Sequence, residues 1–202
     1  TNHSSRRLRR GLTQALGPME EFVSRFDQES IEALTVLANS DAEFVLAPSC
    51  FVEIGKSLLW VNTLTIPLGS GRAFYLDMTT HEFGMENYFA EISARILNWD
   101  WPPYPEVDNP YPVRVRLCKR PAPRVSWEQR VERVSILSRR DEDNGEVAAY
   151  DAGIEMLTRD GCTIIAAWPG PNTPGFWLAH AADDINRAIS GLDRRLAISR
   201  RA

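Results

Sequence analysis

An Asp-Gly pair between two apolar runs is the sequence feature that most restricts the fold of this chain. The first run is Ala152–Leu157, the pair is Asp160-Gly161, and the second run is Cys162–Trp168. Glycine takes a positive φ without steric cost, so this arrangement is a strong signal for a β-hairpin. The second run holds too many apolar residues to have a solvent-exposed face, so we expect this strand in the centre of a sheet.

Other short apolar runs, separated by turns, predict further antiparallel strands. They are Phe44–Leu46, Phe51–Ile54, Leu58–Ile66, Ala73–Met78, Val113–Leu117 and Val131–Ser138. The run Val113–Leu117 alternates strictly between apolar residues and arginine, which is typical of a strand with one arginine face. The polar segment 141–145 separates the last strand from the hairpin and is predicted to be a turn.

Apolar residues at helical spacing predict several helices. Residues 18–26 and 30–37 each carry such a stripe, and residues 183–192 carry one after two aspartates that favour a helix N-terminus. The arginines that follow predict a basic tail, and they are Arg194, Arg195, Arg200 and Arg201. The clearest helix is predicted for 79–99, because Thr79 and Glu82 have the spacing of a capping box. Its apolar face comprises Met85, Tyr88, Phe89, Ile92, Ile96 and Trp99.

Together these elements predict an α+β fold, with one or two antiparallel sheets built from hairpins and with helices packed on one side. The length of 202 residues allows a single domain spanning 1–202. It equally allows two halves, 1–98 and 113–202, joined by residues 99–112. The five prolines of that segment rule out a helix and favour a rigid, extended loop.

Composition and charge narrow the function classes. The net charge of −4 disfavours nucleic acid as a partner, and no apolar run is long enough to span a bilayer. No apolar segment of the kind found in a secretory signal follows the polar N-terminus. The three cysteines are widely spaced and form no Cys-x-x-Cys pair, so we expect free thiols in a reducing cytoplasm. Lys56 and Lys119 are the only lysines beside many arginines, and this bias is typical of GC-rich bacterial genomes.

No motif predicts a catalytic or metal site. The triplet Gly55–Ser57 lacks the glycine of a phosphate-binding loop, because Cys50 stands five residues before it. His81 begins no zinc-binding helix of the His-Glu-x-x-His type, since the second histidine is replaced by Met85. Cys162 follows a turn rather than opening a helix, so nothing lowers its pKa. We therefore expect no cofactor, and a non-enzyme is favoured.

Aromatic residues in two proline-rich loops are the best candidates for a binding surface. Tyrosine and tryptophan on rigid loops lose little entropy on binding a protein. The candidates are Trp99, Trp101, Tyr104, Tyr111, Trp168 and Trp177. The alternative is that these side chains fold inward and close the ends of the sheet.

The leading hypothesis is therefore non-catalytic binding of another protein, as an inhibitor or immunity-type protein of a bacterial cytoplasm. The rival is an enzyme or small-ligand-binding protein with a pocket between the two halves. That pocket would be lined by Trp60, Tyr75, His81 and His180. Homo-oligomerisation through the aromatic patch is a third hypothesis.

Overall fold

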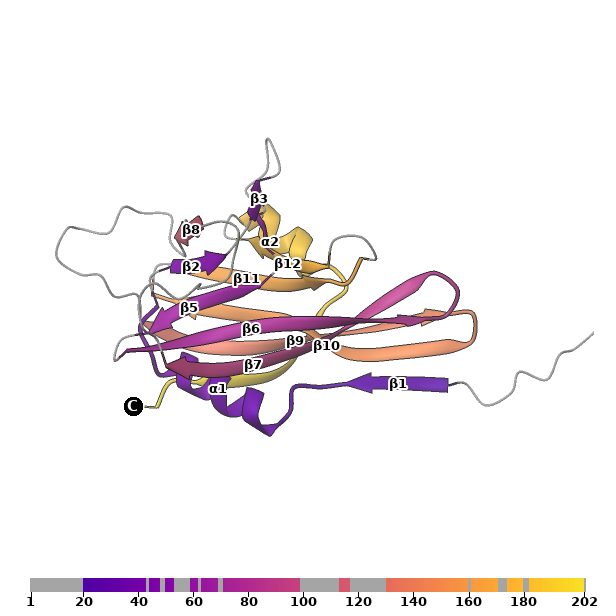
Figure 1. Cartoon of the computed structure of the whole chain (residues 1–202), viewed down its shortest axis with the longest axis horizontal. Coiled ribbons are helices and arrows are strands. Elements are labelled where there is room, and N and C mark those ends of the chain that lie inside the picture. Colours follow the sequence, from indigo (N-terminus) through magenta and orange to yellow (C-terminus); the bar gives the residue numbers. More distant parts are fainter. Residues whose placement is uncertain are drawn as a thin grey trace, which may run out of the picture.

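The computed structural model of the chain describes residues 20–42, 44–47, 50–52, 59–61, 63–68, 71–98, 113–116, 130–159, 161–170, 174–179 and 182–201. These residues form two stacked β-sheets and two helices, α1 (Gln28–Ala38) and α2 (Ala182–Ala188) (Figure 1). Among them, no helix has the length and apolar character needed to cross a membrane.

The larger sheet has eight strands, in the order β13-β9-β10-β11-β12-β4-β3 with β1 beside β10. Their bounds are β1 Glu20–Ser24, β3 Cys50–Val52, β4 Leu59–Val61, β9 Val131–Asp143, β10 Glu146–Thr158, β11 Gly161–Trp168, β12 Gly175–Ala179 and β13 Asp193–Ser199. The predicted hairpin is confirmed as β10 and β11, and Gly161 has the expected positive φ of 154°. The central place of β11, between β10 and β12, is confirmed as well.

The smaller sheet has the order β7-β6-β5-β2-β8 and is antiparallel throughout. Its strands are β2 Phe44–Ala47, β5 Leu64–Leu68, β6 Arg72–Phe83, β7 Asn87–Asn98 and β8 Val113–Arg116. The long hairpin β6–β7 and the hairpin β9–β10 extend to the same end of the molecule, on the right in Figure 1. The predicted turn at 141–145 is narrower than expected, because Asn144 and Gly145 alone make it, both with positive φ.

The helix predicted for residues 79–99 is wrong. Residues 79–83 belong to β6, residues 87–98 form β7, and the two strands pair from Arg72↔Asn98 to Phe83↔Asn87. Along β7 the buried residues Ala90, Ile92 and Ala94 alternate with exposed ones, which is the period of a strand. Strand pairing satisfies the backbone while burying that face against the core, and this outweighs the local capping signal.

The helix predicted for residues 18–26 is also wrong for residues 20–26, the part that the structure describes. Residues 20–24 form β1, which pairs in parallel with residues 146–150 of β10. Phe22 stacks on Phe89 of the smaller sheet with ring centroids 5.9 Å apart. A parallel partner so far along the chain leaves no local signal in the sequence. The helix predicted for 30–37 is confirmed by α1, whose N-terminus is capped by Asp27 through the Ser30 amide.

Two hydrophobic clusters lie on opposite faces of the larger sheet. Ile164 and Ile165 are neighbours on β11, so they point to opposite faces, and they belong to different clusters. The larger cluster fills the space between the sheets and includes α1, whereas α2 covers the smaller cluster. The α+β composition with mainly antiparallel sheets is confirmed. The expected packing of the helices on one side is not confirmed, because each helix packs on a different cluster.

The C-terminal segment also differs from the prediction. The end of the chain was expected to be a basic tail after a last helix, and α2 does begin with Asp183 and Asp184 in its first turn. Arg194 and Arg195 lie in β13, which pairs with β9 at the edge of the larger sheet, and Arg200 and Arg201 follow that strand. The predicted linker 99–112 lies outside the described residues.

Candidate functional site

Trp168 and Trp177 are the two predicted binding residues that the structure describes, and they lie side by side. Trp168 ends β11 and Trp177 lies in the neighbouring strand β12, opposite Ala166. The indole rings meet edge to face with centroids 6.4 Å apart. Trp168 is 51% exposed, whereas Trp177 is half-buried against the smaller cluster. The other four candidates, Trp99, Trp101, Tyr104 and Tyr111, lie outside the described residues.

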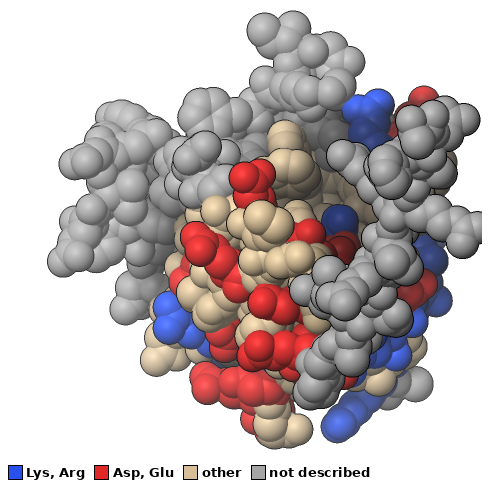
Figure 2. All heavy atoms as spheres, turned by 90° about the vertical axis from the view of Figure 1, so that its right-hand side faces the viewer, with Lys and Arg blue, Asp and Glu red and all other residues tan. Residues whose placement is uncertain are grey.

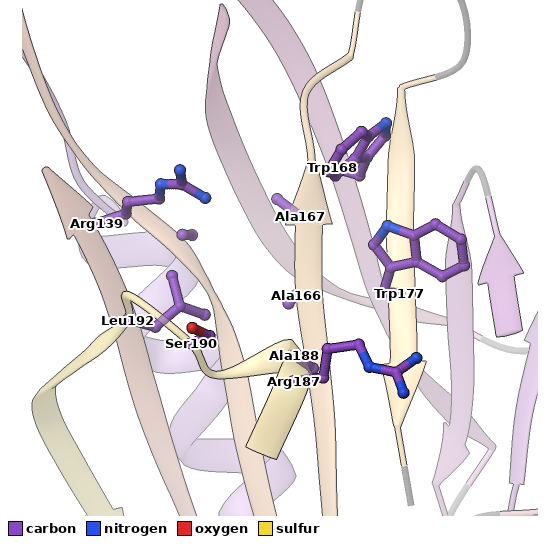
Figure 3. Close-up of a pocket in the computed structure, with 10 residues that line it drawn as sticks. Arg139, Ala166, Ala167, Trp168, Trp177, Arg187, Ala188, Ser190 and Leu192 are labelled. Atoms are coloured by element: carbon purple, nitrogen blue, oxygen red, sulfur yellow. The ribbon is translucent and has the colours of Figure 1, made fainter. Parts of the chain in front are cut away.

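A pocket of about 280 Å³ opens beside the two indoles (Figure 3). Its apolar lining includes both tryptophans and the alanines Ala152, Ala166, Ala167 and Ala188. The small alanine side chains leave the space that larger residues would fill. Arg139 and Arg187 lie at different sides of the pocket in Figure 3.

A second hollow of about 340 Å³ adjoins the first. The two share Arg139, Ala167 and Trp168, so the exposed indole borders both. The rest of the second lining is mostly polar, and it includes Glu86, Tyr88, Asp141, Glu142 and Tyr150. An apolar pocket and an acidic hollow therefore meet at Trp168.

Arg139, Asp141 and Tyr150 are joined by hydrogen bonds in the lining of the second hollow. Arg139 donates from Nε to Asp141 Oδ1 at 2.8 Å, and the Tyr150 hydroxyl donates to Asp141 Oδ2 at 3.1 Å. Burial, followed by the nearby Asp141 charge, raises the pKa of Tyr150 well above its ordinary value. The phenol is thus fixed as a hydrogen-bond donor, and both oxygens of Asp141 are occupied.

The turns of the two long hairpins are tied to each other at the acidic end of the molecule. The Gly84 amide donates to Glu146 Oε2 at 2.6 Å, and the Met85 amide donates to Asp143 Oδ2 at 2.8 Å. The Met85 hydrogen bond is the main reason why the pKa of Asp143 is lowered. Figure 2 views this end and shows carboxylates gathered over it. These contacts hold Glu86, in the same turn, beside the second hollow.

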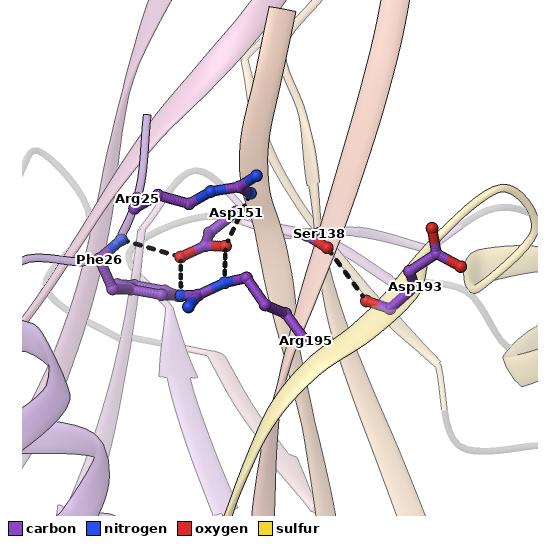
Figure 4. Close-up of polar contacts among 6 residues, drawn as sticks. All are labelled: Arg25, Phe26, Ser138, Asp151, Asp193 and Arg195. Atoms are coloured by element: carbon purple, nitrogen blue, oxygen red, sulfur yellow. Dashed lines mark hydrogen bonds and ion pairs between the residues drawn. The ribbon is translucent and has the colours of Figure 1, made fainter. Parts of the chain in front are cut away.

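Asp151 of β10 is a buried carboxylate with a structural role (Figure 4). It is 2% exposed and accepts two hydrogen bonds from Arg195, at 2.9 and 2.6 Å. The Arg25 guanidinium and the Phe26 amide donate to it as well, at 3.2 and 2.9 Å. Asp151 thereby joins β13 to the segment between β1 and α1, and its acceptor sites are used within the fold.

Glu155 is a second buried carboxylate, four residues further along β10. Arg194 donates to its two oxygens at 2.8 and 2.6 Å. The Cys162 thiol lies 3.7 Å from it, and burial together with the Glu155 charge raises the pKa of Cys162 to about 11. A raised pKa keeps a thiol largely protonated at neutral pH, which disfavours a role for Cys162 as a nucleophile. Arg194 and Arg195, expected in a basic tail, instead pair with buried carboxylates.

Glu155→Gln is expected to destabilise the protein at pH 7 by about 1–3 kcal/mol, since it weakens charge-assisted hydrogen bonds. The Arg194 hydrogen bonds are the main reason why the folded-state pKa of Glu155 lies below the ordinary 4.5. The carboxylate therefore stabilises the fold above pH 4.5, and this contribution is lost as the pH falls through the folded-state pKa. Urea unfolding at several pH values should show less acid sensitivity in the variant. Glu132→Gln, on the exposed side of β9, should behave as wild type.

The rival pocket is not assembled by the described residues. Tyr75 and His81 lie six residues apart on β6, about 20 Å along an extended strand. His81 Nε2 lies 2.7 Å from Glu91, and Tyr75 lies beneath the Arg95 guanidinium at 4.8 Å. Neither residue lines the two hollows at Trp168. The Trp60 side chain and His180 lie outside the described residues. In the described part of the chain, no group of three His, Cys, Asp or Glu residues is placed to hold a metal.

A scan of known protein-family models and searches for similar curated proteins and solved structures found no match. The functional argument therefore rests on the geometry around Trp168. Sequence reasoning missed Arg139 and the alanines of the pocket. The available signal was weak: the Ala166-Ala167 pair directly before Trp168 marks a place with little side-chain volume beside a large ring.

Proposed function

We propose that this chain is a non-catalytic protein-binding protein, of the inhibitor or immunity type, in a bacterial cytoplasm. The observation that carries the proposal is Trp168, a large aromatic side chain that is 51% exposed and borders two adjoining hollows. Tryptophan is among the residues that contribute most to binding energy in protein interfaces. An exposed indole beside ready-made hollows is therefore a suitable anchor for a partner.

Local packing holds Trp168 ready for binding. A β-carbon on Gly170 would lie 2.6 Å from Trp168 Nε1, so the backbone at Gly170 approaches the indole closely. Trp177 packs edge-on against the same ring. Because the side chain is held from two directions, little conformational entropy is lost when a partner covers it.

The charged groups beside Trp168 also favour binding over catalysis. The Asp141 carboxylate accepts from both Arg139 and Tyr150, which leaves it poorly suited to proton transfer. Asp184, in α2, lies 4.0 Å from Arg187 and partly balances the second arginine of the pocket. A rigid, internally satisfied surface is typical of a recognition site.

A small-ligand-binding protein is the second candidate, because the alanine-lined pocket is concave and apolar. Its volume of about 280 Å³ lies at the lower limit of the range of roughly 300–1,000 Å³ typical of small-molecule sites. That size suits one side chain of a partner better than a whole cofactor or substrate.

Trp168→Ala is expected to weaken partner binding at least ~30-fold, or about 2 kcal/mol, because it removes the central anchor. The wild-type chain is immobilised, partners from the source organism are captured and identified, and the strongest one is purified. Calorimetry then compares wild type, Trp168→Ala and the control Leu196→Ala, an exposed apolar residue on β13. Equal affinity of all three proteins would contradict the proposal. A captured partner that is another copy of this chain would point to homo-oligomerisation instead.

A further inference from the structure

We infer that the two hollows at Trp168 receive two neighbouring side chains of one partner segment. A large apolar side chain enters the alanine-lined pocket, and an arginine or lysine enters the acidic hollow. This inference rests on the proposed protein-binding function and specifies the chemistry of the partner.

The apolar pocket selects for a side chain without charge. Its lining combines the two indoles with four alanines and Leu192. Arg139 is engaged with Asp141 at 2.8 Å, and Arg187 lies 4.0 Å from Asp184, so each arginine of the lining has an acidic neighbour. A buried apolar side chain gains roughly 1.5–3 kcal/mol from leaving water, which is enough to anchor a short segment.

The acidic hollow selects for a cation. Among the described residues, its lining includes the carboxylates Glu86, Asp141 and Glu142 and the cation Arg139. Asp141 is already bonded to Arg139 and Tyr150, which leaves Glu86 as the carboxylate that can receive the cation. Glu142 lies 3.6 Å from Arg140 Nε, and the alternation along β9 places the side chains of this pair on the face opposite Arg139 and Asp141.

The surrounding surface has the same sign of charge. Asp143 and Glu146 lie beside the second hollow at the hairpin turns, and Figure 2 shows further carboxylates over this end. Such a surface repels nucleic acid and anionic lipid and attracts a basic segment. Charge complementarity therefore favours a basic protein segment as the occupant.

Trp168 sets the spacing between the two side chains. Both hollows include Ala167 and Trp168, so their centres are close together. An extended segment advances about 3.3 Å per residue and alternates its side chains between two faces, so side chains two positions apart, about 7 Å, lie on one face and would reach both hollows.

The test uses the full chain, labelled with ¹⁵N, and short blocked peptides followed by NMR titration. The probes are acetyl-Gly-Phe-Gly-Arg-Gly-amide (the Phe-Arg peptide), its Phe→Ala form and its Arg→Glu form, and the glycine between Phe and Arg places both side chains on one face of an extended chain. We expect the Phe-Arg peptide to bind at least ~10-fold more tightly than either altered peptide. The Trp168 indole N–H signal and the Ala167 and Ala188 amide signals should shift. No saturable binding, or equal affinity for all three peptides, would overturn the inference.

Two variants assign each side chain to its hollow. Ala188→Met fills the apolar pocket and should abolish the preference for Phe over Ala, with Ala197→Met on exposed β13 as its control. Glu86→Gln should abolish the preference for Arg over Glu and keep that for Phe. Its control is Glu132→Gln. Retention of both preferences in the pocket variants, with shifts elsewhere, would also overturn the inference.

Failure of this inference is distinguishable from failure of the proposed function. If a captured partner depends on Trp168 while the three peptides bind equally, the binding function stands and the assigned partner chemistry is wrong. If the Phe-Arg peptide binds at both hollows while Trp168→Ala leaves partner capture unchanged, the hollows recognise a peptide and the proposed interface is wrong.

Discussion

Asp151→Ala is expected to lower the free energy of unfolding by about 2–4 kcal/mol, because it leaves buried donors without an acceptor. Two Arg195 nitrogens, the Arg25 guanidinium and the Phe26 amide all donate to this carboxylate. The arginines are partly exposed and can recover some hydration, but the Phe26 amide cannot. Urea denaturation at pH 7, followed by circular dichroism, measures the loss.

The matched control is Asp193→Ala in β13. The Asp193 side chain points away from this cluster in Figure 4, and the Asp193 backbone carbonyl accepts from Ser138 at 3.4 Å. Removing an exposed carboxylate of this kind typically changes stability by less than about 0.5 kcal/mol. Similar losses for the two variants would mean that the Asp151 contacts do not hold β13 and the β1–α1 segment in place.

Gly153→Ala is expected to have the second large effect, a loss of roughly 2–5 kcal/mol, because it combines backbone strain with a steric clash. Gly153 has a φ of +151° and lies at the bulge where the β9–β10 register shifts. A β-carbon there would lie 2.2 Å from the Ile165 carbonyl oxygen and 2.9 Å from Ala166 Cα. Both obstacles are backbone atoms of β11, so a side-chain rotation cannot relieve them.

Gly161→Ala separates the two contributions. Gly161 has nearly the same φ, +154°, but a β-carbon there meets nothing within 4 Å. This variant should show the conformational cost alone, about 1–3 kcal/mol. The difference between the two variants in thermal and urea unfolding then measures the close approach of β10 and β11. Equal losses would show that the approach relaxes without cost.

The hairpins β9–β10 and β10–β11 were the part of the fold that local sequence could predict. The Asp-Gly and Asn-Gly pairs mark turns whose positive φ values few other residues adopt, and both turns join paired strands. The segment 79–98 shows the limit of such reasoning. Ile92 and Ile96 are four residues apart, and an offset of four places two residues on one face of either a helix or a strand. Only the partner strand β6 decides between them.

The pairing of strands that are far apart in the chain could not be predicted from the sequence, for a different reason. β1 lies beside β10 in parallel, and β13 lies beside β9, without a turn that would reveal either pairing. The same holds for the site. Trp168 and Trp177 were predicted as binding residues from their loops, but the pocket beside them needs Ala152, Arg139 and Ala188 from three other elements. No pattern in the sequence brings those residues together.

The pairing of β10 has a consequence for the order in which the strands fold and unfold. β10 pairs with β9 along its length, with β11 at one end and with β1 at the other. Its two hairpins close locally, on a timescale of roughly microseconds, whereas β1 docks only after the loop that contains the whole smaller sheet has closed. β1 is therefore expected to add late during folding and to detach at a lower free energy than the core. Amide hydrogen exchange in β1 should then be faster than in β11, although both strands pair with the same edge of β10.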